Sequence, residues 1–153
     1  MKLRENDTIA DVNVLKSSKS MQIAAGADDD DSSSESTEDE YVLAVTSHGY
    51  GKRVRTTEFR TQARRGAGSI AIKFKKNRHS SDRMSCLRIV KEDDEILVIT
   101  AKGIMVRQQV SEIPSQGRSA TGVTIQKVDV DNGDHISSVS LVPKYEDADD
   151  ILE

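Results

Sequence analysis

The sequence predicts an all-β protein built from about two four-stranded, propeller-like blades. Two stretches, beginning at Tyr41 and at Glu95, repeat one another without a gap for about thirty residues, with a period of roughly 54 residues. Within each stretch, short β-branched runs alternate with turns that contain glycine. Hydrophobic residues make up 35% of the chain and aromatic residues 3%, so we expect part of it to lie outside any core.

The repeat is visible residue by residue. The matched pairs are Leu43 and Leu97, Thr46 and Thr100, Gly49 and Gly103, Arg53 and Arg107, Glu58 and Glu112, Gln62 and Gln116, Arg64 and Arg118, Gly68 and Gly122, and Lys73 and Lys127. The sequence of the closing strand of a repeat occurs three times, beginning near Asp7, Asp82 and Asp134. Repeat arrays need about three or more units for stability. We therefore expect a piece of a longer array, or a chain that needs a partner.

This repeat divides the chain into five parts. We expect a closing strand of a truncated blade at 1–15, an acidic disordered linker at 16–40, blades at 41–92 and 93–143, and an acidic tail at 144–153. In the first blade the predicted strands are Tyr41–Thr46, Lys52–Arg55, Ser69–Phe74 and Met84–Val90. Ser47–Gly49 is predicted to be a hairpin turn that ends on a left-handed glycine, and Lys75–Arg78 a polar turn.

The net charge of −4 conceals a segregation of charge. Between Tyr41 and Val128 there are 17 Lys and Arg residues against 7 Asp and Glu residues, and the acids dominate outside that span. A basic body with acidic appendages favours a nucleic-acid partner over the alternative, a soluble domain with an incidental charge dipole.

The most basic stretch runs from Gly49 to Lys73 and is punctuated by glycines. Arginine forks bind phosphate oxygens bidentately, and glycines let the backbone approach a ligand. Such a loop would suit a polyanion. A tight turn with a solvated basic face is an equally good interpretation of this stretch alone.

Several functional classes find no support in the sequence. The three histidines, His48, His79 and His135, lack metal-ligand spacing, and no Ser-His-Asp or Cys-His arrangement is arguable. Cys86 is the single cysteine, which excludes a disulfide framework. No phosphate loop for nucleotides and no apolar run long enough to span a membrane occur, so no membrane partner is expected.

Four sequence blocks resemble late blades of the C-terminal domain of DNA gyrase A. They are Gly49–Arg53, Gln62–Gly68, Asp93–Ile96 with the following Val98–Thr100, and Val110–Ile113 followed by Gly117, Arg118, Gly122 and Val123. The resemblance implies a β-pinwheel, a propeller-like disc around whose basic rim DNA wraps. The family's Gln-Arg-Arg-Gly-Gly-Lys-Gly box belongs to the first blade. Here Ala63 and Ala67 replace its Arg and Lys, as in a looser, later-blade version.

The resemblance also implies a function and partners. The domain would bind double-stranded DNA without sequence preference and support ATP-dependent negative supercoiling by the full type IIA topoisomerase. Its partners would be the remaining blades, the breakage-reunion domain and gyrase B. ATP and Mg would belong to other parts of the holoenzyme, so this chain would need no cofactor and catalyse nothing alone. Tyr41, Tyr50 and Tyr145 are expected to be structural. The location would be a bacterial nucleoid, a plastid or a mitochondrion, with an organelle favoured by the acidic insert.

Two alternatives stay open: the equivalent domain of topoisomerase IV, and a propeller-type module whose basic face binds an acidic protein. Under the DNA-binding interpretation, Gln62, Gly66 and Gly68 shape the basic loop. The expected DNA-contact residues are Lys52, Arg53, Arg55, Arg60, Arg64, Arg65, Lys73, Lys75, Lys76, Arg78, Arg107 and Arg118.

Overall fold

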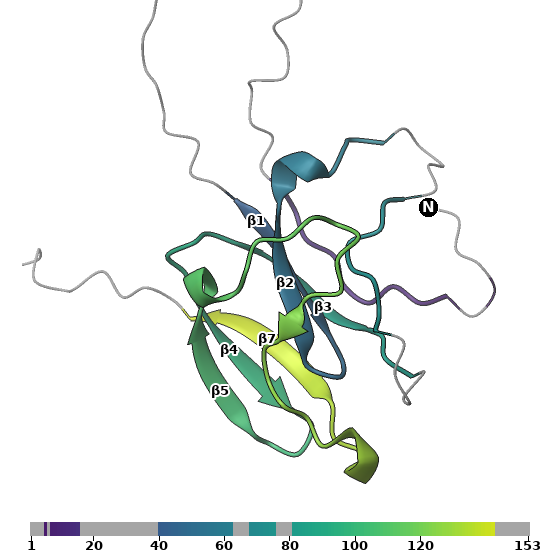
Figure 1. Cartoon of the computed structure of the whole chain (residues 1–153), viewed down its shortest axis with the longest axis vertical. Coiled ribbons are helices and arrows are strands. Elements are labelled where there is room, and N and C mark those ends of the chain that lie inside the picture. The colour runs from purple at the N-terminus through teal and green to yellow at the C-terminus, as the bar shows by residue number, and fades with distance from the viewer. Residues whose placement is uncertain (1–4, 6, 16–39, 63–67, 76–80, 143–153) are drawn as a thin grey trace, which may run out of the picture.

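The computed structural model describes residues 5, 7–15, 40–62, 68–75 and 81–142 (Figure 1). Its regular elements there are β-strands and short 3-10 turns, which confirms the all-β prediction. No helix in this described part is long and apolar enough to cross a membrane. The predicted acidic linker, apart from Glu40, and the predicted acidic tail lie outside the described residues.

The first sheet has the strand order β3-β1-β2-β6. Strands β1 (Tyr41–Thr46) and β2 (Tyr50–Arg55) form an antiparallel hairpin, and β3 (Met84–Val90) pairs with the other edge of β1. The hairpin turn has Gly49 at φ 83°, the left-handed region that glycine enters without a Cβ penalty. The predicted turn and the strand Met84–Val90 are confirmed.

The second sheet repeats this pattern with the order β5-β4-β7. Strands β4 (Glu95–Thr100) and β5 (Met105–Gln109) form its hairpin, and β7 (Ile136–Val142) closes it. The register shifts at the same place in both sheets, between Val45 and Thr46 and between Ile99 and Thr100. Equivalent 3-10 turns follow the two hairpins, η2 (Thr56–Glu58) and η3 (Val110–Glu112). A third turn, η4 (Val130–Asn132), precedes β7.

One hydrophobic core joins the two sheets. Leu43 and Val45 of the first hairpin pack in the same cluster as Ile96 and Val98 of the second, together with Val139 of β7. A backbone hydrogen bond from Ile136 N to Ser47 O, 2.8 Å long, ties β7 to the first hairpin turn. Because the apolar faces bury one another, neither sheet has a separate core.

One strand of the second predicted blade belongs to the sheet of the first. Strand β6 (Val123–Thr124) belongs to the second repeat in sequence, yet it pairs with Tyr50 and Gly51 of β2 (Figure 1). Upstream of β6, Arg53 N donates to Pro114 O and Gln116 N donates to Arg53 O. The segment 114–124 of one repeat therefore completes the sheet of the other.

Two of the predicted strands are wrong. Residues 69–74 form no strand, although Lys73 N donates to Ala120 O at 3.1 Å. Their repeat mates, 123–128, include β6, which pairs with β2, whereas no described strand pairs with 69–74. Among the described residues of 1–15 there is no strand either. Val12 and Val14 are 77% and 89% exposed, so they add nothing to the hydrophobic core.

Candidate nucleic-acid interface

Two expected DNA contacts, Lys52 and Arg53, are buried. Lys52 is 0% exposed, and its Nζ donates to Gly117 O at 2.5 Å and to Arg118 O at 2.7 Å. Burial lowers the pKa of this lysine, against an opposing effect of Glu58. The ammonium therefore holds the crossing segment on β2, and we correct its assignment as a phosphate contact.

Arg53 has a similar structural role. Its Nε donates to Ile113 O at 2.6 Å, its Nη2 bonds Glu92 Oε1 at 2.9 Å, and the guanidinium lies 4.7 Å from the centre of the Tyr41 ring. The side chain is 9% exposed. Since the guanidinium is already engaged by protein groups, Arg53 is also removed from the interface. The sequence could not separate these two cations from their exposed neighbours.

Seven of the ten remaining expected contacts fall into three groups, and the other three, Lys73, Lys75 and Arg118, lie together. Arg55 and Arg60 are exposed at and after the end of β2. Arg107 is exposed but forms an ion pair with Glu95, with Nε 2.6 Å from Oε2. Arg64, Arg65, Lys76 and Arg78 lie outside the described residues, as does Gly66.

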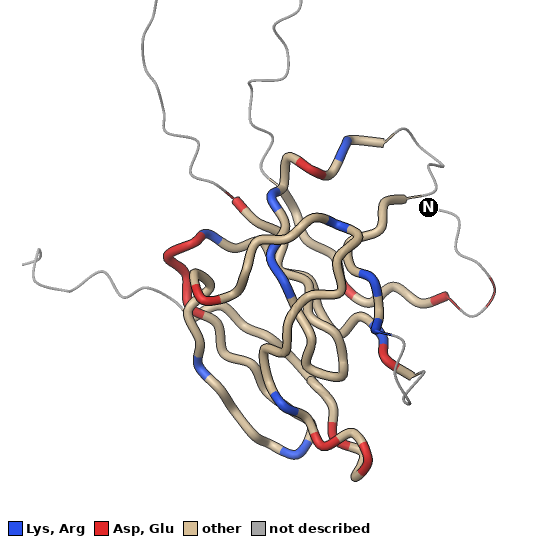
Figure 2. The backbone as a smooth tube through the Cα atoms, in the orientation of Figure 1, with Lys and Arg blue, Asp and Glu red and all other residues tan. Residues whose placement is uncertain are grey.

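Four cations on neighbouring segments, Arg118, Lys73, Lys75 and Lys127, are called the basic strip. Arg118 lies 6.0 Å from the centre of the Phe59 ring, and the neighbouring backbone at Ala120 bonds Lys73 N. Lys75 Nζ lies 4.6 Å above the Tyr50 ring, and Tyr50 pairs with Thr124, three residues from Lys127. Lys73, Lys75 and Lys127 are exposed. In Figure 2, acidic segments gather instead at the turn before β4 and around η4.

Lys127 was not among the expected contacts, although it is the repeat mate of Lys73. The signal was therefore present in the 54-residue registry. What the sequence could not show is that segments about fifty residues apart lie on the same side of one sheet. Strand β6 brings Lys127 next to β2, and the 73–120 hydrogen bond brings Lys73 to the same surface.

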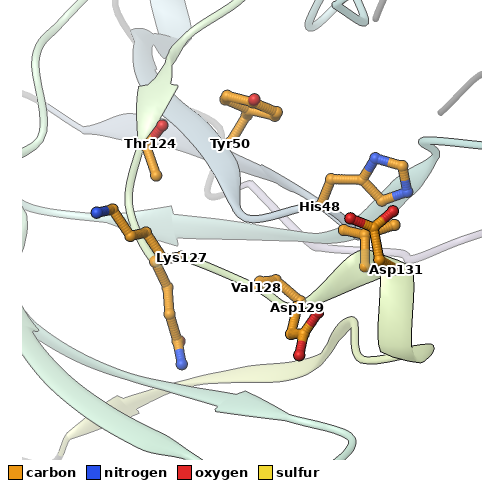
Figure 3. A pocket seen from close by; sticks show the side chains of 9 residues that line it. His48, Tyr50, Thr124, Lys127, Val128, Asp129 and Asp131 are labelled. Carbon is orange, nitrogen blue, oxygen red and sulfur yellow. The ribbon is translucent and has the colours of Figure 1, made fainter. Parts of the chain in front are cut away.

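The basic strip ends at a recess of about 410 Å³ between the first hairpin turn and the segment 124–131 (Figure 3). Tyr50, Thr124 and Lys127 line one side, and Asp129 and Asp131 line the other. The two carboxylates would repel a phosphate. A polyanion that follows the strip would therefore stop or turn at this recess.

Gln62 closes the base of the basic loop. Its Nε2 donates to Ser69 Oγ and its Oε1 accepts from Gly68 N, both at 3.0 Å. Gly68 has φ 81°, which favours glycine. The loop-shaping roles of Gln62 and Gly68 stay a prediction, because residues 63–67 lie outside the described residues.

The structure also places Ser81, His48 and Asp82 next to one another, an arrangement that the sequence did not reveal. Ser81 Oγ is 3.4 Å from His48 Nε2, but His48 Nδ1 is 3.9 Å from Asp82 Oδ1, too far for a hydrogen bond. Asp82 instead caps the turn by accepting from His48 N at 3.0 Å. Asp134 does the same for Lys102 N in the second repeat. The cluster is therefore a repeated turn cap.

Within the described ranges, no group of three His, Cys, Asp or Glu side chains is placed to hold a metal ion. The cationic surface is thus suited to binding an anion through lysine and arginine side chains. Because this cationic surface includes residues of both repeats, it fits an extended polyanion better than a small one.

Comparison with known proteins identifies the family. A sequence model described as the DNA gyrase C-terminal domain, beta-propeller, matches residues 40–80 and 94–143. The DNA gyrase A of Synechocystis sp. is 38% identical over 94% of this chain, and that of Haloquadratum walsbyi is 34% identical over 74%. The chain spans 17% and 13% of those two relatives.

Solved structures agree with this assignment. A structure of a DNA gyrase A C-terminal domain matches with a TM-score of 0.60 and 27% identity, over 70% of this chain and 35% of the other. The C-terminal domain of a DNA topoisomerase IV matches with a TM-score of 0.59 over 69% of this chain and 32% of the other; at 24% identity it shows a shared fold. On the family match, the repeat pattern and the fold together, the chain belongs to the DNA gyrase C-terminal domain, beta-propeller, family.

Proposed function

We propose that this chain binds the backbone of double-stranded DNA, as part of the DNA-wrapping domain of a DNA gyrase A. The observation that carries the proposal is the basic strip, in which four cations from two repeats follow one surface. Phosphate contacts of this kind fix position without reading sequence, so binding is sequence-nonspecific.

Within the full type IIA topoisomerase, such binding would support ATP-dependent negative supercoiling. The partners would be duplex DNA, further blades, the breakage-reunion domain of gyrase A, and gyrase B. ATP and Mg would act in those other parts, and this chain alone would not be an enzyme. The protein would work where the DNA is, in a bacterial nucleoid or in a plastid or mitochondrion.

The test is fluorescence anisotropy of the chain with a random-sequence duplex across a salt series. If about five phosphates are neutralised, the slope of log K against log salt is about −4.5. Replacing Lys73, Lys75 and Lys127 by alanine removes three contacts and reduces that slope by about 2.7. The matched control replaces Lys91, Lys102 and Arg107, which changes the net charge equally outside the basic strip.

Equal losses in the two triple variants would mean that only the overall charge matters, and would contradict the basic strip as the binding surface. Loss of an acidic protein partner, with DNA binding unchanged, would favour the protein-interaction module instead. The likeness to topoisomerase IV concerns the fold. Supercoiling or decatenation by the full protein would separate those two enzymes.

A further inference from the structure

We propose that the recess beside the first hairpin turn binds a guanidinium group, carried either by a small molecule or by an arginine side chain. Both walls of the recess lie in the interior of the chain, in residues 48–50 and 124–131. The binding groups belong to Gln126, Asp129, Asp131 and Tyr50, none of which is part of the basic strip. The proposal goes beyond DNA binding and does not depend on it.

The buried amide of Gln126 is the observation that carries the proposal. This residue lines the recess and is 6% exposed, and its Oε1 and Nε2 are both buried without a hydrogen-bond partner among the described residues. Its backbone is held against the hairpin turn, because Gln126 N donates to Gly49 O at 3.3 Å. Buried polar side chains are nearly always paired, since an unpaired one loses its hydration without compensation. A ligand in the recess would supply the pairing that this amide lacks.

The recess residues also break the internal repeat. In the 54-residue registry the mate of Gln126 is Ile72, which is buried in the first repeat. The mate of Asp129 is Lys75, and the mate of Tyr50 is Ile104. The same fold is therefore built in the other repeat without these side chains. A polar residue at a position where the fold accepts an apolar one is expected at a functional site.

The charge of the recess selects a cation. The exposed side chains of Asp129 and Asp131 line one wall, opposite Tyr50 and Lys127 (Figure 3). The Asp129 carboxylate is held in place, because its Oδ2 accepts from Asn132 Nδ2 at 2.6 Å. Two carboxylates on one wall repel an anion and attract a cation. With the amide oxygen of Gln126, they offer hydrogen-bond acceptors to a ligand that has several N–H donors.

The chain itself shows how it holds a guanidinium. The guanidinium of Arg53 lies 4.7 Å from the centre of the Tyr41 ring and donates to a carboxylate, Glu92 Oε1, and to a carbonyl, Ile113 O. The recess offers the same three kinds of group, a tyrosine ring at Tyr50, carboxylates and an amide carbonyl. A planar guanidinium with five donors in a fixed fork matches this set better than the compact ammonium of a lysine.

The size of the recess fits such a ligand. Its volume of about 410 Å³ lies within the range of small-molecule sites, about 300–1,000 Å³. Val128 and Val130, which flank Asp129 on the same wall, are half-buried and provide apolar surface. An alkyl chain attached to the guanidinium can lie against these valines while the charged end reaches the carboxylates.

The test is an NMR titration of the full ¹⁵N-labelled chain without DNA. The probes are N-acetyl-argininamide, which represents an arginine side chain, and methylguanidinium, which represents a free guanidinium compound. We expect N-acetyl-argininamide to bind with a Kd of about 1 mM and to shift the side-chain amide signals of Gln126. N-acetyl-lysinamide has the same charge and is expected to bind about tenfold more weakly.

The two guanidinium probes separate the two sources of the ligand. Equal affinity for both would assign the recess to a free guanidinium compound, because the rest of the arginine residue would then contribute nothing. Tighter binding of N-acetyl-argininamide would assign it to an arginine side chain. Either result supports a guanidinium site.

Gln126→Ile is the matched variant, because it installs the residue that the first repeat has at this position. We expect it to weaken binding of N-acetyl-argininamide at least tenfold. Its thermal unfolding midpoint should be unchanged or higher, because the amide that it removes is buried and unpaired. A lower midpoint would show that Gln126 has a structural role and would overturn the proposal.

The charge requirement has its own pair of variants. Asp129→Asn with Asp131→Asn removes the charge of the acidic wall but keeps the side-chain shapes, and we expect at least a tenfold loss of binding. The control, Asp93→Asn with Glu112→Gln, changes the net charge equally at exposed sites outside the recess. Binding should be unchanged in this control.

Three further results would each overturn the proposal. The first is no shift of the Gln126 side-chain amide with either guanidinium probe at about tenfold the expected Kd. The second is equal affinity for the arginine and lysine probes, which would show attraction by charge alone. The third is a loss of binding in the control variant as large as that in the variant of the acidic wall.

Discussion

The hairpin β1–β2 and the hairpin β4–β5 have the same turn, the same register and the same following 3-10 turn, yet they differ in burial. Strand β2 is covered by the segment 114–124, and its two central cations bond to the backbone of that segment or of the residue after η3. Among the described residues β5 pairs only with β4, and its Arg107 forms an ion pair with Glu95 in the same sheet. Equivalent residues of the two hairpins therefore differ in burial because the segment 114–124 covers one hairpin and not the other.

The largest expected effect breaks the covered hairpin at its closest contact. Gly122→Ala combines a left-handed backbone with a Cβ 2.5 Å from Gly51 O, so we expect a loss of about 3 kcal/mol or more in the free energy of unfolding. Gly68→Ala has the same φ and open space, and should lose about 1 kcal/mol. Urea unfolding measures both, and equal losses would show that the contact with β2 contributes nothing.

The next effect compares the two matched arginines. Arg53→Met leaves the buried carbonyl of Ile113 without its donor and should cost about 2 kcal/mol. Arg107→Met removes an exposed ion pair and should cost about 0.5 kcal/mol or less. Thermal unfolding of the two variants gives the difference. A larger loss at Arg107 would contradict the assignment of Arg53 as the structural member of the pair.

A smaller effect concerns the cation under the crossing segment. Lys52→Met keeps the apolar stem but removes the donor to Gly117 O and Arg118 O, at a cost of about 1.5 kcal/mol. Its mate, Val106, is half-buried, and Val106→Met should be nearly neutral. Hydrogen exchange at the amides of 115–124 reports the loosening, which should be confined to that segment in the Lys52 variant.

The smallest effect at neutral pH concerns the turn cap of the second repeat. Burial alone would raise the pKa of Asp134, but hydrogen bonds from Lys102 N, the Thr100 side chain and His135 N outweigh it and lower that pKa. The stabilisation is therefore present above the unfolded pKa of about 3.9 and is lost as pH falls through the folded value.

Asp134→Asn removes this dependence. Unfolding midpoints measured from pH 7 down to about pH 2 should show the wild-type advantage shrinking at the acid end. A difference between the two proteins that stays constant with pH would show that the carboxylate charge at the turn is not what matters.

Much of the fold was predictable because it is encoded locally. The hairpin turns need a left-handed residue, which Gly49 and Gly103 supply, and the strands Tyr41–Thr46 and Met84–Val90 follow from β-branched runs between turns. The repeat was predictable because the two units use the same residues at the same spacing. The strand predicted at 69–74 is wrong because strand formation also requires a partner edge, and the described part of the chain offers none to this segment.

The charge of the candidate interface was predictable from the sequence, but the residues that form it were not. Composition indicated a basic body, and the resemblance indicated DNA. Lys52 and Arg53 were misassigned because the residue type alone does not show whether a lysine or arginine is buried or exposed. Lys127 was missed because its placement beside the first hairpin depends on the pairing of β6 with β2.

The sequence by itself determined the hairpins, their turns, the period of the repeat and the sign of the charge on the folded part, since each depends on residues close together in the chain. The tertiary structure alone decided which repeat completes which sheet and which cations are buried. The physical reason is that a strand edge and an ammonium group form hydrogen bonds with the groups that lie next to them in space, and the sequence does not show which groups those are. Here those groups come from about sixty residues away.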